Sequence, residues 1–345
     1  MGDVLEFSNT RINSSELNSG NYVSTENILQ NFQGIVKARS IPEDTNVMAF
    51  SCGNILLSNI RPYLKKVWKA TFNGGCSSDV FVLQANSNID ADYLHYVVAN
   101  DKFIGFVMNG AKGVKMPRGD KNQMKTYSLS LPSIKEQRKI SRFLSFLDER
   151  IAVQSRLIDR LQSLMIGIRH RIINEAKGKI VCLCEVSDIY QPQTISSADL
   201  TETGYPVYGA NGIIGHYTSY NHEAEQVCIT CRGNTCGGVN YTKSKSWITG
   251  NAMVVNVDRY QNIVSKRYLY HYLSNCDFNS IISGSGQPQI VRAPLAKFKI
   301  ILPTVMQQYK IAHCLDVIQN KINVNSNILN LLIRQKQYLL RKMFI

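Results

Sequence analysis

The sequence repeats itself at a distance of 171 residues, and this internal repeat constrains the fold more than any other feature. Further upstream, segments 81–83 and 93–96 resemble segments 253–255 and 268–271 at slightly larger offsets. Such drift is expected where loop insertions separate matched elements, so we interpret the chain as two copies of one structural plan. The matched residues are Leu131, Pro132, Ser133, Gln137 and Ile140 in the first copy and Leu302, Pro303, Thr304, Gln308 and Ile311 in the second.

A long helical pattern follows each Leu-Pro pair. Proline is tolerated in the first turn of a helix because the N–H that it lacks would have no partner there. Ser133 and Thr304 are followed three positions later by Glu136 and Gln307, which is the spacing of a capping box. We therefore expect the proline to lie in the first helical turn in both copies.

Both helical patterns carry apolar residues at alternating steps of three and four, the a/d pattern of a coiled coil. One such stripe would fit an ordinary amphipathic core helix, but two matched stripes favour pairing with each other. The equivalence of the two copies favours an antiparallel pair. Polar residues at matching seam positions, Gln154 and Asn325, can fix register. The predicted seam is Leu144, Leu147, Ile151, Gln154, Ile158, Leu161, Met165, Ile168, Ile172, Leu315, Ile318, Ile322, Asn325, Leu329, Leu332, Leu339 and Met343, with Lys336 as a further interruption.

These patterns predict an α+β fold with a pseudo-two-fold internal repeat. Two mixed α/β domains at 1–130 and 178–301 would be separated by long helices at 131–177 and 302–345. We expect the helices to form an antiparallel coiled coil. A seam of ~28 residue steps corresponds to ~42 Å of helix.

The charge narrows the class of partner. A net charge of +14 at pH 7 in 345 residues points to a polyanion, and nucleic acid is the first candidate. The helical ranges hold +10 of this charge, and each globular range holds only +2. No apolar run approaches the ~18 residues of a membrane span, and the first residues lack the pattern of a secretory signal. We therefore expect a cytoplasmic protein whose nine cysteines are reduced thiols.

Loops in both globular ranges carry the residue types that DNA readout requires. Arginine and lysine donate to guanine edges and phosphates, asparagine and glutamine pair with adenine, and glycine lets backbone approach closely. An apolar strand at 54–61 runs into a basic stretch, and 227–232 is its predicted counterpart, with Arg232 placed as Arg61 is. For any single residue, a solvated surface side chain is the plainer alternative. The predicted DNA-contacting residues are Arg61, Lys65, Lys66, Lys112, Lys115, Arg118, Tyr208, Asn211, Arg232, Lys243, Gln287, Gln289 and Arg292.

The motifs of several enzyme classes do not occur in this sequence. There is no GxxxxGK[ST] phosphate loop, no GxGxxG after a strand, no HExxH, and no Asn-Pro-Pro-aromatic or Asp-Pro-Pro-aromatic run. Cys228, Cys231 and Cys236 lie close together in the sequence, but a zinc site needs two close pairs: the spacing of Cys228 and Cys231 suits one, and that of Cys182 and Cys184 does not. We expect no metal site and no catalytic residue.

The chain resembles the specificity subunits of type I restriction-modification systems over essentially its whole length. The resemblance is carried by Gly2-Asp3-Val4, by the two Leu-Pro helix entries, by the strand at 55–64 and by the phrase at 208–212. It implies two target-recognition domains that each read one half of a split double-stranded DNA target. It also implies that the helices bind two methyltransferase subunits and that two restriction subunits join the complex.

The resemblance further implies that S-adenosylmethionine, ATP and Mg²⁺ belong to the partner subunits and that this chain needs no cofactor. The predicted helix length is comparable with one turn of DNA, ~34–36 Å, which suits a split target with an unread spacer. Two alternatives remain open. A structural coiled-coil adaptor would show no salt-sensitive DNA binding, and a nuclease with an unrecognised site would need carboxylates that converge in a pocket.

Overall fold

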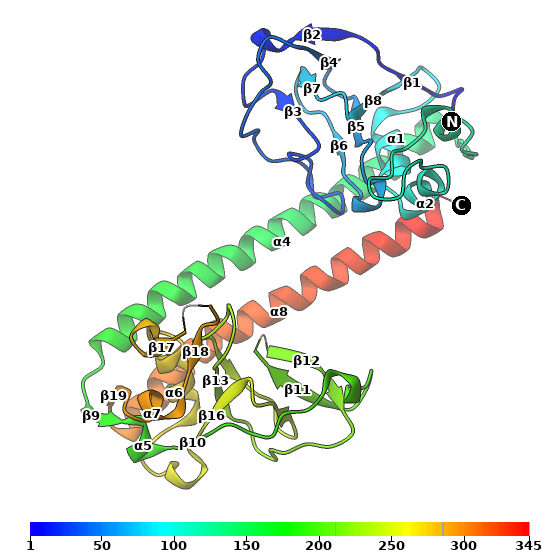
Figure 1. The fold of residues 1–345 in the computed structure, drawn as a ribbon. Coiled ribbons are helices and arrows are strands. Elements are labelled where there is room, and N and C mark those ends of the chain that lie inside the picture. The colour runs from blue at the N-terminus through cyan, green and yellow to red at the C-terminus, as the bar shows by residue number, and fades with distance from the viewer. Residues whose placement is uncertain (211, 285, 345) are drawn as a thin grey trace. The chain divides into compact units, whose positions relative to one another are not determined.

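The computed structural model describes residues 1–210, 212–284 and 286–344. It divides the chain into two compact units: the first unit comprises residues 1–155 with 327–345, and the second unit comprises residues 156–326. Each unit includes part of both long helices, α4 (Ile134–Glu175) and α8 (Val305–Met343), which are labelled in Figure 1. The domain limits expected from the sequence stay a prediction.

The first unit contains two four-stranded sheets. The main sheet has the order β1-β8-β5-β6 with antiparallel neighbours, and the second sheet has the order β2-β4-β7-β3. The central strand β5 is buried along its whole length, since apolar residues cover both of its faces. The elements are β1 (Leu5–Phe7), β2 (Arg11–Asn13), β3 (Tyr22–Val23), β4 (Asn46–Phe50), β5 (Ile55–Ser58), β6 (Val67–Lys69), β7 (Gly74–Cys76), β8 (Val80–Ala85), α1 (Ala91–Val98), α2 (Asp101–Asn109), α3 (Lys121–Lys125) and the 3₁₀ turns Ser14–Glu16 and Pro62–Leu64.

The second unit repeats the main sheet in the order β10-β16-β13-β14. A smaller sheet, β12-β11-β15, and two separate two-stranded pairs, β17-β18 and β19-β9, complete it. The elements are β9 (Lys179–Cys182), β10 (Asp188–Tyr190), β11 (Tyr205–Gly209), β12 (Gly212–Tyr217), β13 (Val227–Thr230), β14 (Val239–Tyr241), β15 (Trp247–Ile248), β16 (Ala252–Asn256), β17 (Ile282–Ser283), β18 (Gln289–Ile290), β19 (Lys299–Leu302), α5 (Leu183–Val186), α6 (Lys266–Leu273), α7 (Arg292–Ala296) and the 3₁₀ turns Ser197–Asp199, Asp258–Tyr260 and Asn279–Ile281.

The internal repeat predicted from the sequence is confirmed by these elements. Strand β8 corresponds to β16, and the short helix α1 corresponds to α6, as the matched segments require. Both short helices begin with a capped N-terminus: the side chain of Asp90 accepts from the third helical N–H of α1, and Ser265 does the same for α6. In each unit the hydrophobic core lies between the main sheet, this short helix and part of the long helices.

A buried glutamine joins each long helix to the short helix that precedes it in the same unit, and we call this arrangement the glutamine latch. Gln137 is 1% exposed; it accepts from the backbone N–H of Asp90 at 2.8 Å and donates to the carbonyl of the preceding proline at 2.9 Å. Gln308 is 0% exposed and makes the same two contacts, at 2.8 Å to Ser265 and at 2.9 Å to its own proline. The latch therefore holds the capped end of α1 or α6 against the long helix.

The long helices begin one residue after the predicted caps. Ser133 accepts from the N–H of Glu136 at 3.3 Å, but the Glu136 side chain bonds to Lys139 in place of completing the capping box. Thr304 and Gln307 form the complete box. The prolines lie before these caps, so the expectation that they occupy the first helical turn is wrong.

Within each unit, the segments of α4 and α8 pack antiparallel. In the first unit, Asp148 in the N-terminal half of α4 forms an ion pair with Lys336 in the C-terminal half of α8. In the second unit, the end of α4 and the start of α8 line one cavity. Every predicted seam residue is buried or partly buried. The Lys336 side chain is 19% exposed, and its amine bonds to the carboxylate of Asp148 within the first unit, so the charge at this seam position is paired.

Candidate DNA interface

Two loops that carry predicted DNA-contacting residues lie side by side in the first unit. The backbone N–H of Arg61, just beyond the end of β5, donates to the carbonyl of Pro117 at 2.8 Å. Lys112 and Arg118 exchange two backbone hydrogen bonds of 2.9 Å, which close the intervening loop into a hairpin. The tip of this hairpin is open to solvent, with Val114 fully exposed. Arg61, Lys112 and Arg118 are thus brought together, and we call this place the strand-end corner.

Carboxylates neutralise some of the cations in this corner. Arg118 forms an ion pair with Asp79 at 3.3 Å, and Lys112 pairs with Asp120 at 2.9 Å. The hydrogen bond to Asp120 raises the pKa of Lys112. Within the described part of the chain, Arg61 has no ion pair and its side chain is exposed. Arg61 is therefore the cation of the corner that is best placed to meet an external phosphate or base.

Lys65 and Lys66 have structural partners. Lys65 pairs with Asp101 at 2.7 Å, and the amine of Lys66 donates to the backbone carbonyl of Thr25. Both side chains are partly buried. A DNA contact by either lysine would have to replace one of these interactions, so the structure ranks them below Arg61 as DNA-contacting residues.

Strained backbone also concentrates beside the strand-end corner. Arg61 and Lys65 have φ values of 51° and 54°, and Asn31 and Phe32 have 54° and 61°. The N–H groups of Asn31 and Phe32 donate to the carbonyls of Leu64 and Lys65 at 3.1 and 2.9 Å, so the two strained segments hold each other. Left-handed non-glycine residues cost ~1–3 kcal/mol each and gather at functional sites. The backbone strain is therefore a second observation, independent of the exposed Arg61 side chain, that points to the strand-end corner as a functional site.

The second unit builds a corresponding corner at the end of β13. The N–H of Gly233 donates to the carbonyl of Pro288 at 3.0 Å, and Arg232 forms a β-bridge with Gln289. Pro117 and Pro288 stand 171 residues apart. The corner therefore collects one arginine and, from the β17-β18 hairpin, the exposed side chain of Gln289.

The predicted equivalence of Arg232 and Arg61 is wrong by one residue. Ser58 pairs with Val80 and Thr230 pairs with Ala252, so β5 and β13 align at an offset of 172. Arg232 consequently occupies the place of Ile60, which bridges to Arg118 in the first unit. The two corners share a backbone plan while presenting different side chains.

The remaining predicted residues of the second unit fall in several places. The ring of Tyr208 is only 6% exposed, and its hydroxyl accepts from the N–H of Lys243 at 3.1 Å. This burial, which also raises the pKa of Tyr208, contradicts a role in base contact and makes the tyrosine a support for the adjacent turn. Asn211 lies outside the described residues. The side chains of Lys243, Gln287 and Arg292 are exposed, as is that of Lys115 in the first unit.

Sequence reasoning missed Asn59, which lies directly before the strand-end corner. Its backbone carbonyl accepts from the N–H of Gly119 at 3.2 Å, and its N–H donates to the backbone carbonyl of Asp79 at 2.8 Å. Its side-chain Oδ1 is buried and has no hydrogen-bond partner among the described residues. An amide residue shortly after the apolar run 55–57 was the available signal.

The cysteines of the second unit do not resemble a thiolate metal site. Burial raises the pKa of Cys228 to about 12, which favours the neutral thiol over the thiolate that zinc requires. In the described part of the chain, no group of three or more His, Cys, Asp or Glu side chains is arranged to hold a metal ion. All nine cysteines are free thiols. None of the described helices is both long and apolar enough to span a membrane.

The long helices also expose apolar side chains at positions outside the predicted seam in both units. In the first unit these are Phe143, Phe146 and Val153 of α4 with Ile328, Leu331 and Tyr338 of α8, all between 38% and 64% exposed. In the second unit they include Leu157 and Leu164 of α4 with Val317 and Val324 of α8, between 39% and 56% exposed. Exposed apolar stripes of this kind mark surfaces that bind other proteins, and we call them the outer stripes.

The two-fold repetition of a sheet, a latched helix and a strand-end corner defines a class of protein built from two matched units. The chain belongs to the family described as the type I restriction modification DNA specificity domain, whose model matches residues 1–163 and 176–334. This membership confirms the resemblance found in the sequence.

Individual relatives with similar sequences are specificity subunits of type I restriction enzymes. The chain is 31% identical over 148 residues to the type I restriction enzyme EcoprrI specificity subunit of Escherichia coli, a match covering 41% of this chain and 36% of that protein. It is 33% identical over 93 residues to the EcoDI specificity subunit of the same species, covering 27% of this chain and 20% of that one. These alignments span about a third or less of each relative. The fold is similar to that of a type I restriction-modification system S subunit from M. genitalium, with a TM-score of 0.70 at 16% identity, covering 100% of this chain and 94% of that one.

Proposed function

We propose that this protein is a non-catalytic DNA specificity subunit that reads a split double-stranded target, one half with each unit. The observation that carries the proposal is the strand-end corner, which occurs twice on the same backbone plan with different side chains. One protein that places different side chains on two equivalent frames is suited to read two different half-sites. The free cation Arg61 and the paired Arg232 and Gln289 are the residues proposed to contact DNA.

The proposal extends to partner subunits. The outer stripes are proposed to bind two methyltransferase subunits, with restriction subunits joining the larger complex in the cytoplasm. S-adenosylmethionine, ATP and Mg²⁺ would belong to those partners. The motif pattern of the sequence supports this division, because the chain carries none of the phosphate-binding or methyl-donor motifs considered above.

Methylation mapping tests the proposal directly. Residues 1–130 are exchanged for the corresponding range of a relative with a different target, and the hybrid is expressed with its methyltransferase partner. We expect one half of the methylated motif to change while the other half and its spacer stay the same. A motif that keeps both halves, or changes both, would contradict the assignment of one half-site to each unit.

A binding measurement separates the alternatives. The complex of this chain with its methyltransferase should bind target DNA with an affinity that falls as salt rises, because phosphate contacts release counterions. A coiled-coil adaptor would show no such dependence. Cleavage or methylation of DNA by the purified chain alone would instead support an enzyme.

A further inference from the structure

The hairpin of the strand-end corner, residues 112–118, has a counterpart in the second unit at residues 283–289. In each hairpin the first residue pairs with the last, and the two pairs stand 171 residues apart. A left-handed glycine follows the first residue in both: Gly113 has a φ of 95° and Gly284 has a φ of 93°. A Cβ on either glycine would meet the carbonyl oxygen three residues later, at 3.3 and 2.5 Å. The two hairpins therefore share one backbone design at the positions that the structure describes.

The tips of the two hairpins differ in side-chain chemistry. In the first hairpin, Val114 is 103% exposed and Met116 is 46% exposed, and we call these two side chains the apolar tip. Met116 matches Gln287 at the offset of 171, and the Gln287 side chain is also exposed. The same place on the turn thus carries an apolar side chain in one unit and an amide in the other. An amide pairs with adenine, whereas an apolar side chain contacts the methyl group of thymine.

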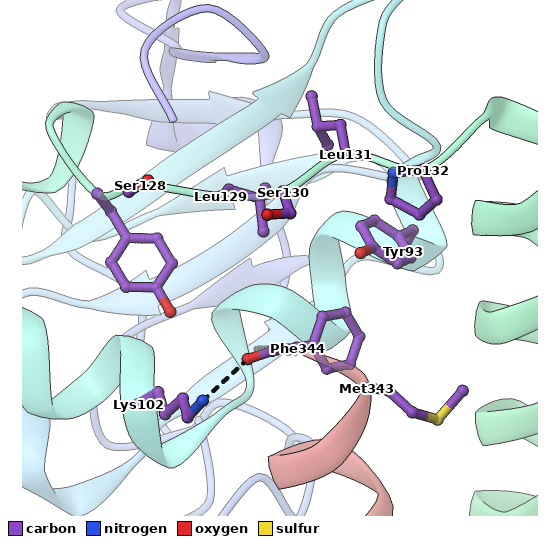
Figure 2. A pocket seen from close by; sticks show the side chains of 10 residues that line it. Tyr93, Lys102, Ser128, Leu129, Ser130, Leu131, Pro132, Met343 and Phe344 are labelled. Atoms are coloured by element: carbon purple, nitrogen blue, oxygen red, sulfur yellow. Dashed lines mark hydrogen bonds between the residues drawn. The ribbon is translucent and has the colours of Figure 1, made fainter.

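The apolar tip projects from the surface of the first unit. The cavity of about 410 Å³ in this unit, shown in Figure 2, is lined by Tyr93, Lys102, the segment 127–132 and residues 343–344. No residue of hairpin 112–118 borders that cavity. A ligand of the apolar tip must therefore supply the groove into which the tip fits.

The charge of the hairpin favours DNA as that ligand. Three of the seven residues 112–118 are basic and none is acidic. Lys112 and Arg118, at the base of the hairpin, are paired with carboxylates. Lys115, which lies between the two residues of the apolar tip, is exposed and forms no ion pair with any residue that the structure describes. A free lysine between two exposed apolar side chains suits a surface on which phosphates border base edges.

The form of the hairpin favours the major groove. The major groove of B-DNA is ~12 Å wide and admits a two-stranded ribbon, whereas the minor groove is only ~6 Å wide. Two paired strands lie ~4.8 Å apart before their side chains are counted, so the minor groove is too narrow for the hairpin. The C5 methyl group of thymine lies in the major groove, where it distinguishes thymine from the other three bases.

We propose that the apolar tip, Val114 with Met116, reads a thymine by contact with its C5 methyl group in the major groove. Lys115 would bind the phosphate backbone beside that base. This inference rests on the proposed function and deepens it, because it assigns an apolar readout to the first unit at the place where the second unit carries an amide. The half-site of the first unit must therefore contain a thymine whose methyl group contributes to binding.

The experiment removes this methyl group from the DNA. The complex of this chain with its methyltransferase is titrated into a fluorescent duplex that carries the target found by methylation mapping, at one fixed salt concentration, and binding is followed by anisotropy. Each thymine of the half-site assigned to residues 1–130, on either strand, is replaced in turn by uracil, which lacks only the C5 methyl group. At least one replacement should weaken binding about fourfold, which corresponds to ~0.8 kcal/mol for one buried methyl group.

A double variant shows whether the apolar tip reads the methyl group. Val114→Ser with Met116→Gln should bind the thymine and uracil duplexes equally, and its circular dichroism spectrum should stay unchanged because both residues are exposed. Val36→Ser is the matched control: it alters an exposed valine of the same unit outside the hairpin, and it should keep the fourfold difference. Uracil in the other half-site should affect the wild type and the double variant to the same extent.

Three results would overturn the inference: equal binding of the thymine and uracil duplexes by the wild type, an equal loss in the wild type and the double variant, or a half-site without thymine on either strand. In the second case another residue would read the methyl group. The proposed function would survive each of these results as long as the complex prefers its mapped target to an unrelated duplex. If the complex shows no such preference, the proposed function fails and this inference fails with it.

Discussion

Replacing the latch glutamine by alanine should destabilise the unit that contains it far more than its single position suggests. Gln137→Ala leaves the N–H of Asp90 and a proline carbonyl without partners at a site that is 1% exposed. Gln308→Ala does the same for Ser265 in the second unit. Gln337→Ala, on the exposed face of α8, is the matched control, since its side chain is exposed.

The expected loss follows from two contributions. Stranding buried backbone groups without partners costs ~1–3 kcal/mol. The void left by a truncated buried side chain adds to this, and comparable truncations cost ~2–5 kcal/mol in total. We therefore expect the free energy of unfolding to fall by about 3 kcal/mol, which is about 1.5 M in the urea midpoint at a typical slope of ~2 kcal/mol per M. Gln137→Met keeps the volume of the side chain, so it should lose only the part of the free energy that comes from the two hydrogen bonds.

The two tryptophans allow each unit to be followed separately, because Trp68 lies in the first unit and Trp247 in the second. Urea unfolding is monitored by fluorescence in Trp247→Phe and Trp68→Phe backgrounds. Gln137→Ala should shift the transition reported by Trp68, and Gln308→Ala the one reported by Trp247. If Gln137→Ala unfolds at the same urea concentration as Gln337→Ala, or if Gln137→Met matches the wild type, the latch does not stabilise the unit as argued.

Four further outcomes are expected. Arg61→Ala and Arg232→Ala should each weaken target binding by the methyltransferase complex by ~1–3 kcal/mol and relax discrimination at one half-site, which a panel of mutated targets in a binding assay would detect; equal losses on all sequences would argue against base contact. Burial lowers the pKa of His95 from 6.5 to about 4, so the folded state resists protonation. The stabilising effect of the neutral histidine is complete above pH 6.5 and is lost as the pH falls towards 4. The free energy of unfolding of the first unit should therefore fall by ~2 kcal/mol between pH 7 and pH 5 in urea titrations, and His95→Gln should remove this loss. Phe146→Asp with Val317→Asp should abolish co-purification of the methyltransferase while the circular dichroism spectrum stays unchanged; retained capture would remove the outer stripes as the docking surface. If the length of the paired helices sets the DNA spacer, deleting one heptad from each long helix removes ~10.5 Å of helix and should shorten the preferred spacer by about three base pairs in methylation maps; an unchanged spacer would show that the helices do not set it.

The long-range organisation was predictable because it depends on periodicity. The seam follows from the spacing of apolar residues, and the antiparallel pairing and the equivalence of α1 with α6 follow from the internal repeat; the structure confirms all three. The latch was not predictable in the same way. Gln137 was recognised as a repeated residue, but its partner Asp90 lies 47 residues away, and no local pattern shows that their backbone paths meet.

The register of the strand-end corner was missed for a related reason. All residues of β5 and β13 are buried, so neither strand alternates between apolar and polar residues, and nothing in the sequence fixes which residue faces which side. Because of this, the sequence comparison aligned Arg232 with Arg61, which is wrong by one residue. Strand β9 was missed because a four-residue strand whose partner lies about 120 residues away has no sequence signal of its own.

The left-handed backbone conformation of Arg61 and Lys65 lowers the stability of the folded chain but favours selective binding of its target. Glycine at either position would relieve strain and stabilise the folded chain, yet it would also free the backbone that aims the arginine before any ligand arrives. A library selected only for thermal stability should therefore accumulate glycine at these two positions. The selected variants should be more stable but should discriminate less between target sequences. Engineers who want a tougher protein with the same target should leave these two positions untouched.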